Sequence, residues 1–233
     1  MGMLIAALAA FLGTHFLLSH PLRAPLVKAV GERGFPGLYS LVALGTFIWV
    51  IIAYRATSIG VPFWEAGDGI WALATVLMLF GSILFAGSLI GNPALPGPPA
   101  LAKAATAQPA RGVFAITRHP MMWGFAIWAL VHLLVSPQPK VIALTVAMAF
   151  LALAGSMGQD AKKVALMGDG WRDWASRTSF VPFGNQLGGK SGWNTAWPGR
   201  TVMLAGIALW LLATWLHPML GAPVAGVWRW MGG

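Results

Sequence analysis

The 233-residue chain has no cysteine and few charged residues. Without cysteine it forms no disulfide, thiolate-ligated metal cluster, covalently attached c-type haem or cysteine nucleophile, whereas non-covalent cofactors stay possible. Only 9% of its residues are charged, against about 25% in an ordinary soluble domain, and 58% are hydrophobic. This composition excludes a soluble globule with a large core and indicates a chain that lies in a membrane.

Charged side chains are missing from six windows of 17 to 22 residues each. These windows are residues 2–20, 38–54, 70–91, 119–136, 141–158 and 201–217. A helix rises 1.5 Å per residue, so about 20 residues cross the hydrocarbon of a bilayer. We therefore predict an all-α, polytopic membrane bundle of about six transmembrane helices, with residues 1–233 as a single domain. The first helix is not expected to be a cleaved signal peptide, because no basic residue precedes it.

The net charge of +9 follows from the expected topology. If the N-terminus lies outside, twelve of the fifteen basic residues fall in cytoplasmic loops: Arg23, Lys28, Arg33, Lys103, Arg111, Arg118, Lys162, Lys163, Arg172, Arg177, Lys190 and Arg200. Only Arg55, Lys140 and Arg229 would lie outside. This positive-inside pattern predicts the inner (cytoplasmic) membrane with both termini outside. The basic charge then faces anionic membrane lipids and not a nucleic acid.

Two stretches between the spans have a distinct composition. Residues 91–117 begin rich in proline and glycine, so they are expected along the cytoplasmic face and not as one continuous helix. Residues 160–177 mix charged with apolar side chains, and Trp171 and Trp174 share a helical face. This segment is predicted to be a cytoplasmic amphipathic helix on the membrane surface, interrupted near Gly168 and Gly170. Residues 184–200 are expected to form a surface loop, reached through a turn in "SFVPF".

Five histidines are the main candidates for chemistry: His15, His20, His119, His132 and His217. His20 and His217 lie at span ends before proline, which favours ordinary interfacial residues. His119 belongs to "RHP", where proline suits the first turn of a helix, so it is compatible with a plain helix start.

His15 and His132 lie within predicted spans, where a histidine is costly and usually faces the bundle interior or a cofactor. On different helices, two imidazoles can be the axial ligands of a haem iron. A zinc or copper site normally needs three or four ligands, and the spans offer no carboxylate or thiolate to complete one. A straight first helix would place His15 about 7 Å deep and His132 nearer 20 Å, so helix tilt must absorb the difference. Hydrogen bonding across helices, without a cofactor, is the alternative.

Several stretches resemble the NnrU family of membrane proteins, to which a zeta-carotene isomerase belongs. They are "FLGTHFLLSHPLRAPLVKAVGERGFPGLYSL", "ITRHPMMWGFAIWALVHLL", "RTSFVPF" and the closing "WLHPMLGA". The resemblance implies a haem b protein that isomerises the 15-cis double bond of 9,15,9′-tri-cis-zeta-carotene, giving the 9,9′-di-cis isomer. The hydrophobic substrate would arrive from the lipid phase. The resemblance also implies that His15 and His132 are the haem ligands, which act in catalysis through the iron.

The sequence departs from the family at one position. The family's isomerase has been linked to a cysteine near the second ligand histidine, which could replace that histidine on the iron after a redox change. Its position is Ala129 here, so that exchange is not available. Arg118 and Arg23 are candidate partners of the haem propionates, or else topology anchors. It also stays open whether His119, and not His132, is the second haem ligand.

Two other function classes fit part of the pattern. Membrane methyltransferases that use S-adenosylmethionine share an "RHPxxxG" helix start, matched by His119, Pro120 and Gly124. Their next helix carries a pair of glutamates, where this chain has Gln159 and Asp160. The NnrU family is also associated with nitrogen-oxide respiration, so a non-catalytic haem protein is the third hypothesis.

Overall fold

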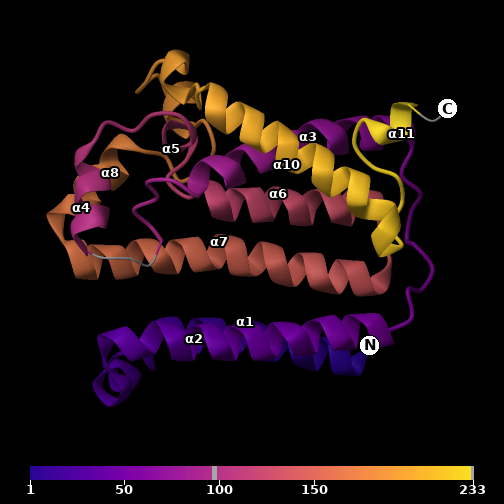
Figure 1. Cartoon of the computed structure of the whole chain (residues 1–233), viewed down its shortest axis with the longest axis horizontal. Helices are drawn as coiled ribbons and strands as arrows, with labels where there is room; N and C mark the ends of the chain where they lie inside the picture. The colour runs from indigo at the N-terminus through magenta and orange to yellow at the C-terminus, as the bar shows by residue number, and fades with distance from the viewer. Residues whose placement is uncertain (96–98, 232–233) are drawn as a thin grey trace.

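Long helices that run side by side make up most of the molecule (Figure 1). The computed structural model describes residues 1–95 and 99–231, and this part of the chain contains helices and turns without any strand. The long helices are α1 (Gly2–Ser19), α2 (Arg23–Ala56), α3 (Asp68–Ser88), α6 (Pro120–Val135), α7 (Pro139–Met167) and α10 (Arg200–Leu216). The short ones are α4 (Pro99–Ala107), α5 (Val113–Ile116), α8 (Asp169–Arg177), α9 (Gly184–Leu187) and α11 (Trp228–Met231), with the 3-10 turns η1 (Trp193–Ala196) and η2 (His217–Leu220).

Five of the long helices are long and apolar enough to cross a membrane. They are α1, α2, α3, α7 and α10, the last extended through η2. The sixth predicted span is α6, an apolar helix of 16 residues that is about 24 Å long, shorter than a hydrocarbon core of about 30 Å. The predicted all-α membrane bundle is confirmed, with five helices of full length and not six.

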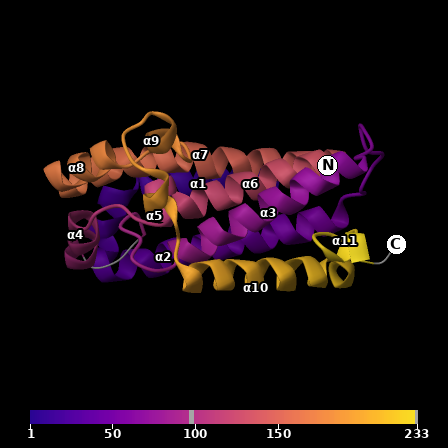
Figure 2. The ribbon, with the colours of Figure 1, turned by 90° about the horizontal axis from the view of Figure 1, so that it is seen from above.

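The helices form a bundle and an attached hairpin. In the bundle, α6 packs on α3 and α7, and α10 packs on α3. Helices α1 and α2 pair with each other, and α1 joins the hairpin to the bundle by packing on α7 (Figure 1). Their shared core includes Leu4, Leu8, Phe11 and Val50. In the view at right angles, α7 and α10 lie toward opposite edges of the molecule (Figure 2).

Helix α2 begins earlier than predicted. Residues 23–37 were expected to form a cytoplasmic loop, but they are helical from Arg23 onward, with a break at Gly31 and Pro36 inside the helix. Gly31 has φ 77°, a left-handed conformation that glycine adopts without the steric cost of a Cβ. The residues before the break are mostly good helix formers, so the segment predicted as a loop is helical. The break at Gly31 separates this short helical segment from the rest of α2.

The two chain termini lie at one end of the bundle, and α4, α5 and α8 lie at the other (Figure 1). As predicted, residues 91–117 are not one helix, because their described part contains the separate α4 and α5. The predicted interruption near Gly168 and Gly170 is confirmed at Gly168, where α7 ends at φ 57° and α8 follows, whereas Gly170 lies inside α8. Residues 160–167 nevertheless belong to α7, so the surface helix is shorter than expected.

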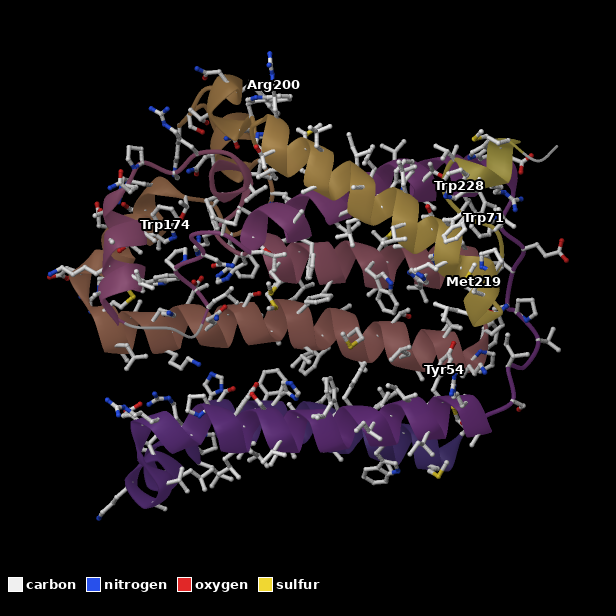
Figure 3. The ribbon with its side chains drawn as sticks, in the orientation of Figure 1. Tyr54, Trp71, Trp174, Arg200, Met219 and Trp228 are labelled. Atoms are coloured by element: carbon white, nitrogen blue, oxygen red, sulfur yellow. The ribbon has the colours of Figure 1, made fainter. Side chains whose placement is uncertain are left out.

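Trp171 and Trp174 of α8 are buried and do not lie on the membrane surface. Their exposed fractions are 0% and 3%, and they pack with Ala94, Phe114 and Val164 (Figure 3, where Trp174 is labelled). The sequence could not predict this, because the covering residues come from distant parts of the chain. The expected surface loop 184–200 is likewise partly folded inward: Gln186 is buried and donates its Nε2–H to the carbonyl of Ala115 at 3.2 Å.

Candidate functional site

His132 lies near the C-terminal end of α6 and faces two aromatic rings. The ring of Trp128, one turn earlier, lies 4.3 Å away between centroids. The ring of His217 lies 6.1 Å away, with only 21° between the two planes. The Nδ1 atom of His132 is 2.8 Å from the carbonyl oxygen of Trp128. Because a carbonyl only accepts, Nδ1 carries the proton, and the lone pair of Nε2 is left for another partner.

His217 closes α10 and begins η2, and its ring is held in the same way. Its Nδ1 lies 2.8 Å from the carbonyl oxygen of Ala213, so its Nε2 also keeps a free lone pair. The sequence predicted an interfacial histidine here and did not pair it with His132. The position at the end of an apolar span was the only signal, because α6 and α10 are far apart in the sequence.

His15 lies on α1 with its ring among aromatic neighbours of the hairpin. Its Nδ1 is 2.7 Å from the carbonyl oxygen of Phe11, which again leaves Nε2 as the free nitrogen. The rings of Phe11 and Tyr39 lie 4.3 and 5.6 Å from its own. Three half-buried histidines, His15, His132 and His217, therefore share the proton arrangement that suits an imidazole ligand.

The structure does not bring His15 and His132 together. Next to His15, the ring of Phe16 lies 5.7 Å from that of Phe150 on α7. His132 lies beside the first turn of α7, because a short connection joins α6 to α7. The two levels differ by about eight residues of α7, or about 12 Å along the bundle. The depth difference expected from the sequence is thus still present in the fold.

Arg118 and His119 bind one carboxylate at the other end of α6. Asp160 of α7 accepts hydrogen bonds from Nε and Nη2 of Arg118 at 2.9 and 2.6 Å, and from Nε2 of His119 at 2.8 Å. The His119 side chain is fully buried, and those of Arg118 and Asp160 are 15% and 19% exposed. Sequence reasoning missed Asp160 as their partner; its signal was an acidic residue just beyond a charge-free window.

The segment "RTSFVPF" closes over the same cluster. The carbonyl oxygen of Phe180 accepts hydrogen bonds from the Thr117 hydroxyl at 2.6 Å and from the Trp123 indole at 2.8 Å. The ring of Phe180 also lies under the Arg118 guanidinium, 5.4 Å from its centroid. These contacts explain structurally why "RHP" and "RTSFVPF" occur in one chain: each supplies partners to the other.

Arg23 lies at the start of α2 and pairs with Glu32 at 3.3 Å. Its guanidinium is also 5.4 Å from the ring of Phe35. Nearby, His20 borders an open groove of about 380 Å³ that is lined with Phe16, Leu17, Pro21 and Gly158. Arg23 and Arg118 therefore have protein partners already.

The residues matched to the methyltransferase pattern have packing partners. Gln159 donates its Nε2–H to the carbonyl of Ala94 at 2.6 Å, and Asp160 is bound by the Arg118 and His119 side chains. At Gly124, an added Cβ would lie 3.1 Å from the carbonyl oxygen of Gly81. This glycine therefore lets α6 approach α3 closely. No group of three His, Asp or Glu residues converges on one point within residues 1–95 and 99–231.

Comparison with known proteins adds a family to this geometry. The model of the NnrU protein family matches residues 3–224. The chain belongs to the NnrU family. This NnrU protein is also 25% identical over 199 residues to the 15-cis-zeta-carotene isomerase, chloroplastic, of Zea mays. The match covers 84% of the chain and 54% of the maize protein, so the chain spans about half the length of that relative. No solved structure matches it at a significant level.

Proposed function

We propose that this NnrU protein is a haem b-dependent membrane isomerase that converts a cis double bond of a polyene to trans. The observation that carries the proposal is the similarity to 15-cis-zeta-carotene isomerase over 84% of the chain. The proposed substrate is 9,15,9′-tri-cis-zeta-carotene and the proposed product is the 9,9′-di-cis isomer. The chain spans about half the length of that relative. The isomerase activity is therefore to be measured on this chain itself.

The donor atoms of the chain suit a haem. His132 presents a free Nε2 inside the bundle, with its proton held on Nδ1 by the Trp128 carbonyl. His15, the second ligand that the family resemblance implies, presents its Nε2 in the same state, at a level about 12 Å away. When bound, a haem would supply an iron able to exchange electron density with a polyene and so weaken the double bond that rotates, while His132 and His15 would hold it.

The other residues predicted to contact the haem, Arg118, His119 and Arg23, differ in how free their side chains are to bind it. The carboxylate of Asp160 takes both Arg118 and His119, so we assign these residues to holding the start of α6 against α7. Arg118 keeps Nη1 free of Asp160 and stays a candidate for a haem propionate. Arg23 is the better one, because its partner Glu32 is 72% exposed and easily replaced by another anion.

A hydrocarbon substrate can reach this protein from the lipid. Helix α2 packs on α1, and only 6% of its apolar window is buried. Leu41, Leu44 and Ile52 are 70%, 55% and 57% exposed, so they contact lipid chains or an apolar ligand in a membrane. The chain's partners are thus proposed to be membrane lipids and a lipid-soluble substrate.

The proposed location is the inner membrane with both termini outside. The two termini lie at one end of the bundle, and α4 and α8 lie at the other (Figure 1), the end that also carries Arg118, Lys162 and Lys163. The positive-inside rule directs that basic end to the cytoplasm.

The test uses the full chain, purified in detergent from haem-replete cells. Absorption spectra before and after dithionite report haem, and chromatography of carotene isomers reports turnover of 9,15,9′-tri-cis-zeta-carotene. We expect a haem spectrum and accumulation of the 9,9′-di-cis isomer. A haem spectrum with rapid nitric oxide binding but no isomerisation favours the non-catalytic haem protein. A colourless protein that binds S-adenosylmethionine contradicts the proposal and favours the methyltransferase.

A further inference from the structure

The C-terminal end of α1 and helix α7 border an open groove at the end of the bundle opposite to the chain termini (Figure 1). The groove has a volume of about 380 Å³, and its lining is mostly apolar: Phe16, Leu17, His20, Pro21 and Gly158. Gly158 brings the hairpin close to α7, because an added Cβ there would lie 2.6 Å from Nε2 of His20. The His20 ring therefore packs on the backbone of α7 and forms one wall of the groove.

Two cationic side chains lie where this groove ends. Lys162 is one helical turn beyond Gly158 on the same face of α7, about 6 Å further along the axis. Arg23 begins α2, three residues after His20. The charges of Lys162 and Arg23 are close enough to repel each other. The groove is thus apolar along its length and positively charged at its outer end.

Little negative charge of the protein faces these two cations. Asp160, two residues before Lys162, lies on another face of α7, where its carboxylate is bound by side chains from the start of α6. Arg23 pairs with Glu32, which is 72% exposed, so this pair is weak. In the part of the chain that the structure describes, Lys162 forms no ion pair. An anion from outside the chain would therefore relieve the repulsion between the two cations.

We propose that the groove, together with Arg23 and Lys162, binds one anionic phospholipid of the surrounding membrane. The lipid phosphate lies between the two cations, and one acyl chain lies in the groove beneath them. This order matches the membrane surface, where an anionic headgroup layer attracts basic residues just beyond the apolar part of a span. The two cations come from α2 and α7, which the fold links through α1. A bound lipid thus joins the hairpin to the bundle a second time, and its binding does not depend on haem.

The test is native mass spectrometry of the full-length protein in detergent, titrated with dioleoylphosphatidylglycerol or dioleoylphosphatidylcholine. These two lipids share their acyl chains and differ in net charge. The variants are Lys162→Gln, Lys162→Arg and Gly158→Leu, whose side chain fills the groove. Lys103→Gln, at an exposed position on α4, is the matched control. Inorganic phosphate is the competitor that carries charge without chains, and haem absorbance and thermal unfolding are recorded on the same samples.

We expect the first phosphatidylglycerol to bind more tightly than the first phosphatidylcholine. Loss of one cation beside a lipid phosphate lowers affinity about fivefold, so Lys162→Gln should bind phosphatidylglycerol about fivefold more weakly. Lys162→Arg and Lys103→Gln should match the wild type. Gly158→Leu should weaken the binding of both lipids, because the acyl chain loses its groove.

Three results would overturn the proposal. The first is equal binding of the two lipids by the wild type, or unchanged phosphatidylglycerol binding in a folded Lys162→Gln protein. The second is displacement of phosphatidylglycerol by inorganic phosphate, which would show a site for a soluble anion. The third is loss of haem from Lys162→Gln with phosphatidylglycerol binding intact, which would assign the cations to a haem propionate. Lipid binding is measured directly, so a wild type without haem gives the same test.

Discussion

The carboxylate of Asp160 on α7 accepts a hydrogen bond of 2.8 Å from Nε2 of His119 at the start of α6. The same carboxylate binds Arg118 through two nitrogens. Three charged or polar side chains thus form one largely buried cluster between two helices, closed by Phe180. This cluster joins α6 to α7 at the end of α6 opposite to His132. Its role is to hold the two helices together.

Removing the charge of Asp160 should destabilise the protein. In Asp160→Asn, the buried Arg118 guanidinium loses its anion, and breaking such a pair costs about 3 kcal/mol of unfolding free energy. Thermal unfolding in detergent measures the loss. The matched control is Asp173→Asn, which breaks an ion pair with Arg177 where Asp173 is 63% exposed, and should cost less than about 1 kcal/mol. Equal stability of the two variants would contradict the structural role.

Lys163 should hold the segment that follows α3. Its Nζ donates to the carbonyl of Pro93 at 2.6 Å, and the residue is 9% exposed. Lys163→Met keeps the length of the side chain but leaves that carbonyl unpaired, at a cost of about 1–3 kcal/mol. Limited proteolysis should then cut residues 91–111 faster than in the wild type. Lys103→Met, at an exposed position, should leave the cutting rate unchanged.

The contact between α10 and α3 should tolerate no side chain at Gly206. In Gly206→Ala, the new Cβ would meet the backbone of Ile83 at 2.7 Å, so α10 must shift, at about 1–3 kcal/mol. Gly155→Ala is the control, because open space surrounds Gly155 in α7 and alanine favours a helix. Melting temperatures should fall for the first variant and stay level or rise for the second. A stable Gly206→Ala protein would show that α10 packs differently.

The absence of cysteine makes the orientation directly measurable. Ser58 follows α2 at the end that holds the termini, and Ser176 lies in α8 at the opposite end; both are exposed. In the proposed orientation the basic end faces the cytoplasm, so a membrane-impermeant maleimide applied to intact cells should label Ser58→Cys, and Ser176→Cys only after permeabilisation. The reverse labelling would place both termini inside.

Composition and charge spacing were sufficient to predict the membrane class, the approximate positions of the long helices and the break at Gly168. These features depend on local properties: apolar length, the position of charge and the φ angle that glycine permits. Helix ends were less well predicted. Helix α2 runs back to Arg23 and α7 runs on to Met167, because helical propensity continues beyond the apolar stretch.

The sequence by itself determined which side chains can act inside the membrane: a few histidines, without cysteine or carboxylate in the charge-free windows. Only the tertiary structure decided how they are used. It sets His217 beside His132, keeps His15 at another level, and gives His119 to Asp160. Such distances depend on how α6, α7 and α10 pack across long sequence separations, through contacts such as Gly206 against Ile83. No periodicity within one helix encodes them.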